Sequence, residues 1–208
     1  MHLMSSSFSD GQRIPVEFAF CAPDPERHAR LAPNRNPHLR WTGVPSTARS
    51  LVLLCVDTDV PTRPDDVNKE GRTVPADLPR TDFHHWVMVD IAPTVSEIAA
   101  GSASDGVTAR GKRAPQGPAG ARQGLNDYTA WFAGDADMDG QYFGYDGPCP
   151  PWNDARLHHY HFVLYATDLE RCPVEDGFTG AQVKEAIAQH VLAEARLTGT
   201  YTLNPSVK

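Results

Sequence analysis

The chain has 208 residues, of which 40% are hydrophobic, so it is long enough to bury one core. This length favours a single domain over residues 1–208 with inserted loops. The 26 acidic and 19 basic residues give a net charge of −7 without a long Lys/Arg cluster, which argues against nucleic acid and anionic membrane surfaces as partners.

The N-terminal sequence MHLMSSSFSDGQRIP lacks the basic and apolar regions of a signal peptide, and no apolar run reaches the length of a membrane span. The cysteines Cys21, Cys55, Cys149 and Cys172 lie far apart and form no C-x-x-C pair. This usage predicts reduced, structural thiols in a cytoplasmic protein, rather than disulfides or a zinc site.

The 18 prolines and 16 glycines separate short apolar or alternating runs, a pattern that favours antiparallel β structure. Three runs rich in β-branched, aromatic or leucine side chains are predicted as strands, at 50–59, 84–91 and 158–168. Two long segments, 61–82 and 99–147, separate these strands. Loops of this length in a compact domain are usually functional or mobile.

One helix is predicted, over 179–197. Apolar residues such as Val183 and Ile187 recur there at helical spacing, and Gly199 supplies a stop. A short strand is expected to follow at 200–203.

Side chains alternate between the two faces of a strand. In 84–91 this places His85 on the face of Val87 and Val89, and His84 on the face of Trp86. In 158–168 it separates His158 from its histidine neighbours, which lie on the opposite face.

The same alternation predicts a polar cluster at the converging strand ends, formed by Asp57, Asp59, His85, His158 and Tyr160. A few polar groups beside an apolar core are typical of a ligand pocket. Structural roles stay open as alternatives, since strand histidines often only pack or face solvent, and the two aspartates would cap the following turn.

The residue types in this cluster suit an anion. An aspartate that accepts a hydrogen bond from an imidazole makes that imidazole more basic. His158 is therefore expected to present an N–H group near neutral pH. Tyr160 adds a neutral donor, and Gly147 allows close approach to the backbone. Pro150 and Pro151 would form a stiff wall. We therefore expect a phosphate or carboxylate group as the ligand.

Three other chemistries have weaker signals. His85, His158 and an aspartate would make a facial metal triad, but no H-E-x-x-H motif accompanies them. No G-x-S-x-G elbow is present, and Cys149 lies between prolines. The acidic run 135–146 matches several positions of a calcium loop but lacks helical flanks. We expect neither a metal nor a cofactor.

Three segments resemble the signature blocks of the phosphatidylethanolamine-binding protein family, also called Raf kinase inhibitor-like proteins, and its bacterial branch in particular. They are DTDVPT (57–62), FHHWVMVDI (83–91) and YDGPCPPWNDARLHHY (145–160). The likeness extends over 8–203. It implies a mainly β fold, an antiparallel Greek-key β-sandwich of two sheets with a C-terminal helix and long inserted loops.

The resemblance also implies a small pocket for phosphate or a phospholipid head group. Two departures stand out: Thr58 replaces a proline of the eukaryotic pattern, and Phe83 replaces a tryptophan. The inserts 63–82 and 105–140 could lid or narrow the pocket. The ligand-binding residues implied are Asp57, Asp59, His84, His85, Gly147, Pro150, Pro151, His158 and Tyr160.

Together these features predict a non-catalytic binding protein for phosphate, phosphorylated small molecules or phospholipid head groups. Two alternatives remain open. One is a regulatory protein of the kinase- or protease-inhibitor type, with a protein partner. The other is a small-molecule hydrolase or metal-dependent enzyme that uses the same Asp/His cluster. Bacterial members of the family also suggest a homodimer.

Overall fold

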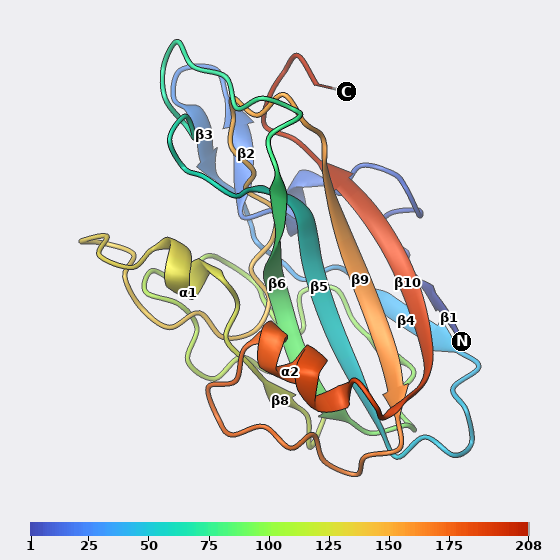
Figure 1. Cartoon of the computed structure of the whole chain (residues 1–208). Helices are drawn as coiled ribbons and strands as arrows, with labels where there is room; N and C mark the ends of the chain where they lie inside the picture. Colours follow the sequence, from blue (N-terminus) through green and yellow to red (C-terminus); the bar gives the residue numbers. More distant parts are fainter. Residues whose placement is uncertain (208) are drawn as a thin grey trace.

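The computed structural model describes residues 1–207, which form a mainly β structure with two α-helices and one short 3₁₀-helix (Figure 1). The helices are η1 (Val16–Phe18), α1 (Tyr128–Trp131) and α2 (Gly180–Ile187). The strands are β1 (His2–Met4), β2 (Cys21–Asp24), β3 (His28–Leu31), β4 (Leu39–Thr42), β5 (Ser50–Pro61), β6 (Arg80–Ile91), β7 (Glu97–Ile98), β8 (Arg122–Gln123), β9 (His158–Thr167) and β10 (Val191–Tyr201).

The long strands form one antiparallel sheet in the order β10-β9-β5-β6-β8. A smaller sheet, β1-β4-β7, packs against one face of it, and β2 and β3 form a separate hairpin. The three strands predicted from their apolar runs correspond to β5, β6 and β9. The predicted antiparallel β-sandwich is confirmed.

Two apolar clusters cover the two faces of the large sheet. Between the sheets, Leu39 and Trp41 of β4 pack with Leu53 of β5 in the main core. On the opposite face, Val52 and Val183 belong to a second cluster under α2. Because both of its faces are covered, β5 is buried over nearly its whole length, which explains its continuous apolar sequence.

The predicted C-terminal helix is correct only in its first half. A capping box between Thr179 and Gln182 starts α2 as expected, but the helix ends at Ile187. Val191–Tyr201 instead pairs along β9, and this long ladder outweighs the helical propensity of its Ala, Glu, Leu and Arg residues. Within residues 1–207, no helix is long and apolar enough to cross a bilayer.

The predicted faces of the two β6 histidines are exchanged by a β-bulge. Cys55 pairs with Trp86 and Val56 pairs with His84, so His85 is an extra residue on β6. The bulge places His85 on the same side as Trp86, toward the main core. His84 turns to the other face, where its ring lies against Gly180 of α2.

The prediction of four reduced cysteines is wrong for two of them. Cys21 of β2 forms a disulfide with Cys149, although 128 residues separate them. The pairing depends on tertiary contact: the backbone N–H groups of Phe20 and Cys21 both donate to the carbonyl oxygen of Pro148, which precedes Cys149. Cys55 and Cys172 are free and buried, as expected.

Candidate functional site

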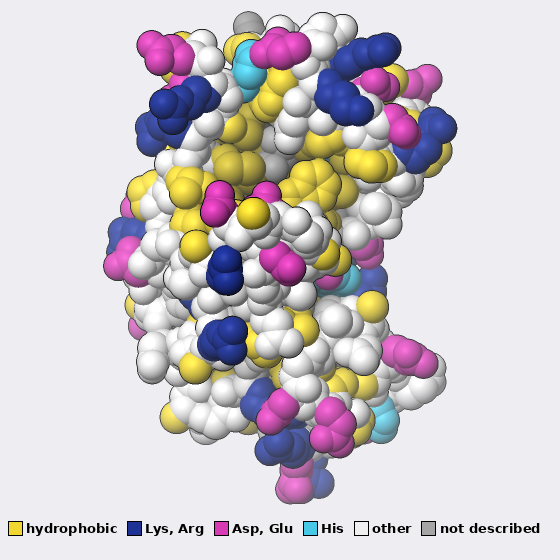
Figure 2. Space-filling model, turned by 90° about the vertical axis from the view of Figure 1, so that its left-hand side faces the viewer, with side chains coloured by type: hydrophobic (Ala, Val, Ile, Leu, Met, Phe, Trp, Pro, Cys, Tyr) yellow, Lys and Arg dark blue, Asp and Glu magenta, His cyan; other side chains and the backbone are white. Residues whose placement is uncertain are grey.

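A cavity of about 670 Å³ opens between the β2–β3 hairpin, α1 and one end of the large sheet. Figure 2 shows this hollow bordered by hydrophobic side chains. The lining residues are Phe20, Cys21, Leu31, Asp57, Val60, Pro61, Pro64, Val67, Asn68, Phe83, His85, Tyr128, Trp131, Phe132, Asp137, Met138, Cys149, Pro150, Pro151, His158 and Tyr160.

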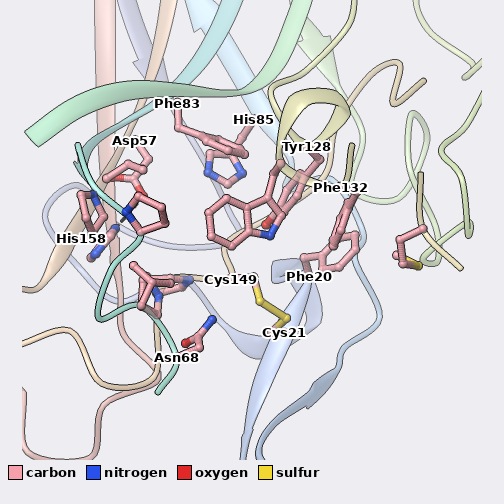
Figure 3. Close-up of a pocket in the computed structure, with 18 of the residues that line it drawn as sticks. Phe20, Cys21, Asp57, Asn68, Phe83, His85, Tyr128, Phe132, Cys149 and His158 are labelled. Atoms are coloured by element: carbon pink, nitrogen blue, oxygen red, sulfur yellow. Dashed lines mark hydrogen bonds and ion pairs between the residues drawn. A yellow bond between two sulfur atoms is a disulfide. The ribbon is translucent and has the colours of Figure 1, made fainter. Parts of the chain in front are cut away.

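The cavity has chemically different ends (Figure 3). We call Asp57, His85, His158 and Tyr160 the polar end. We call Phe20, Tyr128, Trp131 and Phe132 the aromatic end. The polar end comes from β5, β6 and β9, which are neighbours in the large sheet. The aromatic end is formed largely around α1, where Phe20 stacks on Tyr128 with ring centroids 4.7 Å apart.

His158 lies between two carboxylates at the polar end. Its Nδ1–H donates to Asp57 Oδ2 at 2.7 Å and its Nε2–H donates to Asp154 Oδ2 at 3.0 Å. Burial alone would lower the pKa of His158, but the two aspartates raise it to about 9. His158 is therefore a cation at neutral pH, and both of its N–H groups are already used.

This arrangement changes the role expected for His158. The sequence predicted a donor to a bound anion, whereas the structure shows a histidine that holds Asp57 in place. Arg80 continues the network, with Nη1 and Nη2 donating to the two oxygens of Asp154 at 2.5 and 3.0 Å. The buried network therefore contains two cations and two carboxylates, and its charges balance.

His85 keeps one ring nitrogen available to the cavity. Its Nδ1–H donates to the carbonyl oxygen of Asp146 at 2.8 Å, and Nε2 forms no hydrogen bond within residues 1–207. Burial lowers the pKa of His85, although Asp57 acts in the opposite direction. Neutral His85 accepts a hydrogen bond at Nε2, and protonated His85 donates one.

Tyr160 is fully buried, and its hydroxyl forms no well-aligned hydrogen bond within residues 1–207, although burial and the neighbouring Asp57 carboxylate raise the pKa of this hydroxyl. Its ring packs edge-on against His85 with centroids 5.1 Å apart, and it lines the polar end of the cavity. An unpaired buried hydroxyl costs about 1–3 kcal/mol, so this donor is destabilising in the free protein.

Three residues of the predicted site do not line the cavity. Asp59 lies on the opposite face of the sheet because a second bulge separates it from Asp57. There it accepts a hydrogen bond from His159 Nδ1–H at 2.8 Å and pairs with Arg156 at 2.6 Å. His84 is the second: its bulge turns its ring toward α2, and its Nδ1–H donates to Asp127 Oδ2, just before α1, at 3.1 Å.

Gly147 is the third. A Cβ atom at this position would lie 2.1 Å from the carbonyl oxygen of Phe18, so glycine is required by packing of the turn against η1. Pro150 and Pro151, which follow it, do line the cavity. The structure thus places Asp57, His85, Pro150, Pro151, His158 and Tyr160 at the cavity, and it does not place Asp59, His84 and Gly147 there.

Both inserts contribute to the cavity wall. The first supplies Pro64, Val67 and Asn68, and the second supplies Tyr128 and Trp131 of α1 and the turn that contains Met138. These mainly apolar residues extend the polar end into a longer amphipathic cavity. The acidic run 135–146 does not form one loop: Asp135 accepts hydrogen bonds within a local turn, whereas Asp146 is buried and bonded to Lys112, Asn34 and Asn126.

Sequence reasoning missed Asp154 and Arg80, which complete the network around His158. Asp154 lies four residues before His158, a spacing that carries no strand signal, and Arg80 lies at the end of an insert without apolar pattern. It also missed the Cys21–Cys149 disulfide, both of whose residues line the cavity.

Comparison with known proteins agrees with this fold. The family model described as phosphatidylethanolamine-binding protein matches residues 4–202. A UPF0098 protein of Methanothermobacter thermautotrophicus is 32% identical over 201 residues, covering 97% of this chain and 98% of the relative. The UPF0098 protein YbhB of Escherichia coli is 28% identical over 202 residues, covering 97% and 100%.

Two solved structures have a similar fold. YbcL of Escherichia coli, described as a new member of the mammalian PEBP family, matches with a TM-score of 0.69 and 26% identity over 97% of each chain. CT736 of Chlamydia trachomatis, a putative PEBP homologue, matches with a TM-score of 0.64 and 29% identity over 96% of this chain and 95% of that one. The chain therefore belongs to the phosphatidylethanolamine-binding protein family, as its three sequence blocks and its bacterial relatives indicate.

Proposed function

We propose that this protein is a non-catalytic binding protein whose cavity takes a phosphate-type anion attached to an apolar body, such as a phosphorylated small molecule or a phospholipid head group. The observation that carries the proposal is the Tyr160 hydroxyl, which forms no hydrogen bond within residues 1–207 and lies at the polar end of a mainly apolar cavity. A phosphate oxygen is a strong acceptor for such a donor.

The shape of the cavity supports a ligand larger than a free ion. At about 670 Å³ it lies in the range of small-molecule sites and exceeds the volume that one phosphate group needs. Trp131 lines the aromatic end while 48% of its surface remains exposed, which leaves an aromatic face for an apolar group to cover.

The arrangement of the polar end supports binding over catalysis. Both nitrogens of His158 are committed to carboxylates, so this histidine is not placed as a general base. The sulfur of Cys149 is part of a disulfide, which removes it as a nucleophile. The disulfide also removes the cysteine-based reason for assigning the protein to the cytoplasm, because disulfides persist mainly in oxidising compartments.

Tyr160→Phe tests the proposal because it deletes only the unpaired hydroxyl. We expect the variant to be as stable as the wild type or up to about 1 kcal/mol more stable, since no hydrogen bond is lost. We expect its affinity for phenyl phosphate to fall about tenfold or more, because a charge-assisted hydrogen bond is lost. Thermal unfolding with and without phenyl phosphate, phosphoethanolamine and a neutral alcohol measures both quantities.

Tyr145→Phe is the matched control. The Tyr145 hydroxyl donates to the carbonyl oxygen of Phe18 at 2.6 Å and does not line the cavity. This variant should lose about 1–2 kcal/mol of stability and keep its affinity. Equal affinity of the wild type and Tyr160→Phe, or stabilisation by the neutral alcohol alone, would exclude the proposed anion site.

A further inference from the structure

The polar end of the cavity lacks a free cation. Within residues 1–207, no lysine or arginine lines the cavity, and the charged residues that do are Asp57, Asp137 and His158. Dedicated phosphate sites usually present arginine, lysine or a row of backbone N–H groups. An anion that enters the cavity must therefore be recognised without a direct contact to a lysine or arginine side chain.

The cations behind the cavity are already saturated. His158 gives both N–H groups to Asp57 and Asp154. Arg80 gives its donors to Asp154 and to the carbonyl oxygens of Asp59, Leu78 and Pro75. Neither side chain has an N–H group left to donate to a ligand.

Asp57 presents only acceptor atoms to the cavity. Oδ1 accepts from the Asp59 N–H at 2.8 Å, and Oδ2 accepts from His158 Nδ1–H at 2.7 Å. Both oxygens therefore act as acceptors, and each has capacity for one more hydrogen bond. An anion whose oxygens are all acceptors would face this carboxylate with no proton between them, and the contact would be repulsive.

We propose that the cavity selects anions that carry their own proton: the P–OH group of a hydrogen phosphate ester donates to Asp57 while another phosphate oxygen accepts from Tyr160. This inference rests on the proposed function and narrows its ligand class. Asp57 then serves as a specificity-determining residue that rejects sulfate and sulfate esters, which have the same shape but no proton to give.

Phenyl phosphate and phenyl sulfate provide a matched pair of probes. At pH 5 the first is mainly a monoanion with one P–OH group, because the second pKa of a phosphate monoester is about 6. The second is a monoanion without a proton. The two have nearly the same size and the same charge, so a difference in affinity reports the donated hydrogen bond.

We expect titration calorimetry of the wild type at pH 5 to give phenyl phosphate at least tenfold higher affinity than phenyl sulfate. A buried sulfate oxygen that faces the Asp57 carboxylate has no proton to share with it, and such a contact between two acceptors is costly. In Asp57→Asn, whose amide can donate, this preference should fall to about threefold or less. Asp139→Asn is the control: it removes an exposed carboxylate that does not line the cavity and should keep the full preference.

The outcomes separate this inference from the proposed function. Equal binding of both esters by the wild type overturns the inference and leaves the anion site standing. Full preference retained in folded Asp57→Asn overturns the role of Asp57. If neither ester binds the wild type, the proposed function fails and the inference fails with it. Should Asp57→Asn not fold, the wild-type comparison still decides the proton requirement.

Discussion

At the scale of single residues, the site is organised by His158, which holds Asp57 between the sheet and the cavity. The histidine is 1% exposed and forms ion pairs with Asp57 and Asp154. His158, Tyr160 and Asp57, which alternation along the strands had grouped together, all line the cavity. Alternation did not reveal that the histidine bonds to two carboxylates, because Asp154 and Arg80 lie outside the strand pattern.

The raised pKa of His158 makes stability depend on pH. The pKa is about 9 in the folded protein and near 6.5 in the unfolded chain, so the stabilisation is complete below pH 6.5 and disappears as pH rises through 9. We expect the free energy of unfolding to fall by about 3 kcal/mol between pH 6 and pH 10 from this group. Urea unfolding across this range should show the fall.

His158→Gln provides the comparison, since glutamine does not titrate. The difference in unfolding free energy between wild type and variant should shrink as pH rises. A difference that stays constant from pH 6 to pH 10 would show that His158 is not charged in the folded protein.

At the scale of elements, the strands were predictable and their irregularities were not. The apolar runs of β5, β6 and β9 identify them without structural data. One bulge turns His85 toward the main core and another turns Asp59 to the opposite face of the sheet. Both depend on how neighbouring strands pair, which cannot be predicted from the sequence of one strand alone. For the same reason the predicted helix ran on to residue 197, with a strand only at 200–203, whereas Val191–Tyr201 pairs with β9.

The turn at Gly147 offers a steric test at this scale. In Gly147→Ala the new Cβ would meet the Phe18 carbonyl 2.1 Å away, so the turn must shift. We expect a loss of stability on the order of 3 kcal/mol and weaker binding of phenyl phosphate, because Pro150 and Pro151 would move with the turn.

Gly117→Ala is the control. Its Cβ would meet its nearest neighbour, Gln123 Nε2, at an ordinary 3.5 Å, so stability should change little. Chemical denaturation of the two variants compares them directly. If Gly147→Ala matched Gly117→Ala in stability, packing against η1 would not be the reason for glycine at 147.

At the scale of the whole molecule, the cavity joins segments that are distant in sequence. The β2–β3 hairpin, both inserts and three strands of the large sheet meet around it. The Cys21–Cys149 disulfide connects the hairpin to the proline turn across 128 residues. Such long-range closure could not be predicted from cysteine spacing, because the two residues meet only once the fold is complete.

Removal of this disulfide should destabilise the protein. The double variant Cys21→Ser/Cys149→Ser is expected to lose up to about 5 kcal/mol of stability, since a long loop is no longer closed in the unfolded chain. Its affinity for phenyl phosphate should also fall, because both residues line the cavity. Cys172→Ala, at a free cysteine away from the cavity, controls for the loss of a buried sulfur. Unchanged unfolding of the wild type after treatment with a dithiol reductant would contradict this expectation.

The most direct test of the proposed binding site is a crystal structure of the protein with phenyl phosphate at pH 5. We expect the phosphate within hydrogen-bond distance of Tyr160 Oη and Asp57, and the phenyl ring against the aromatic end of the cavity. A phosphate bound outside the polar end, or an empty cavity in a crystal that is saturated with the ligand, would contradict it.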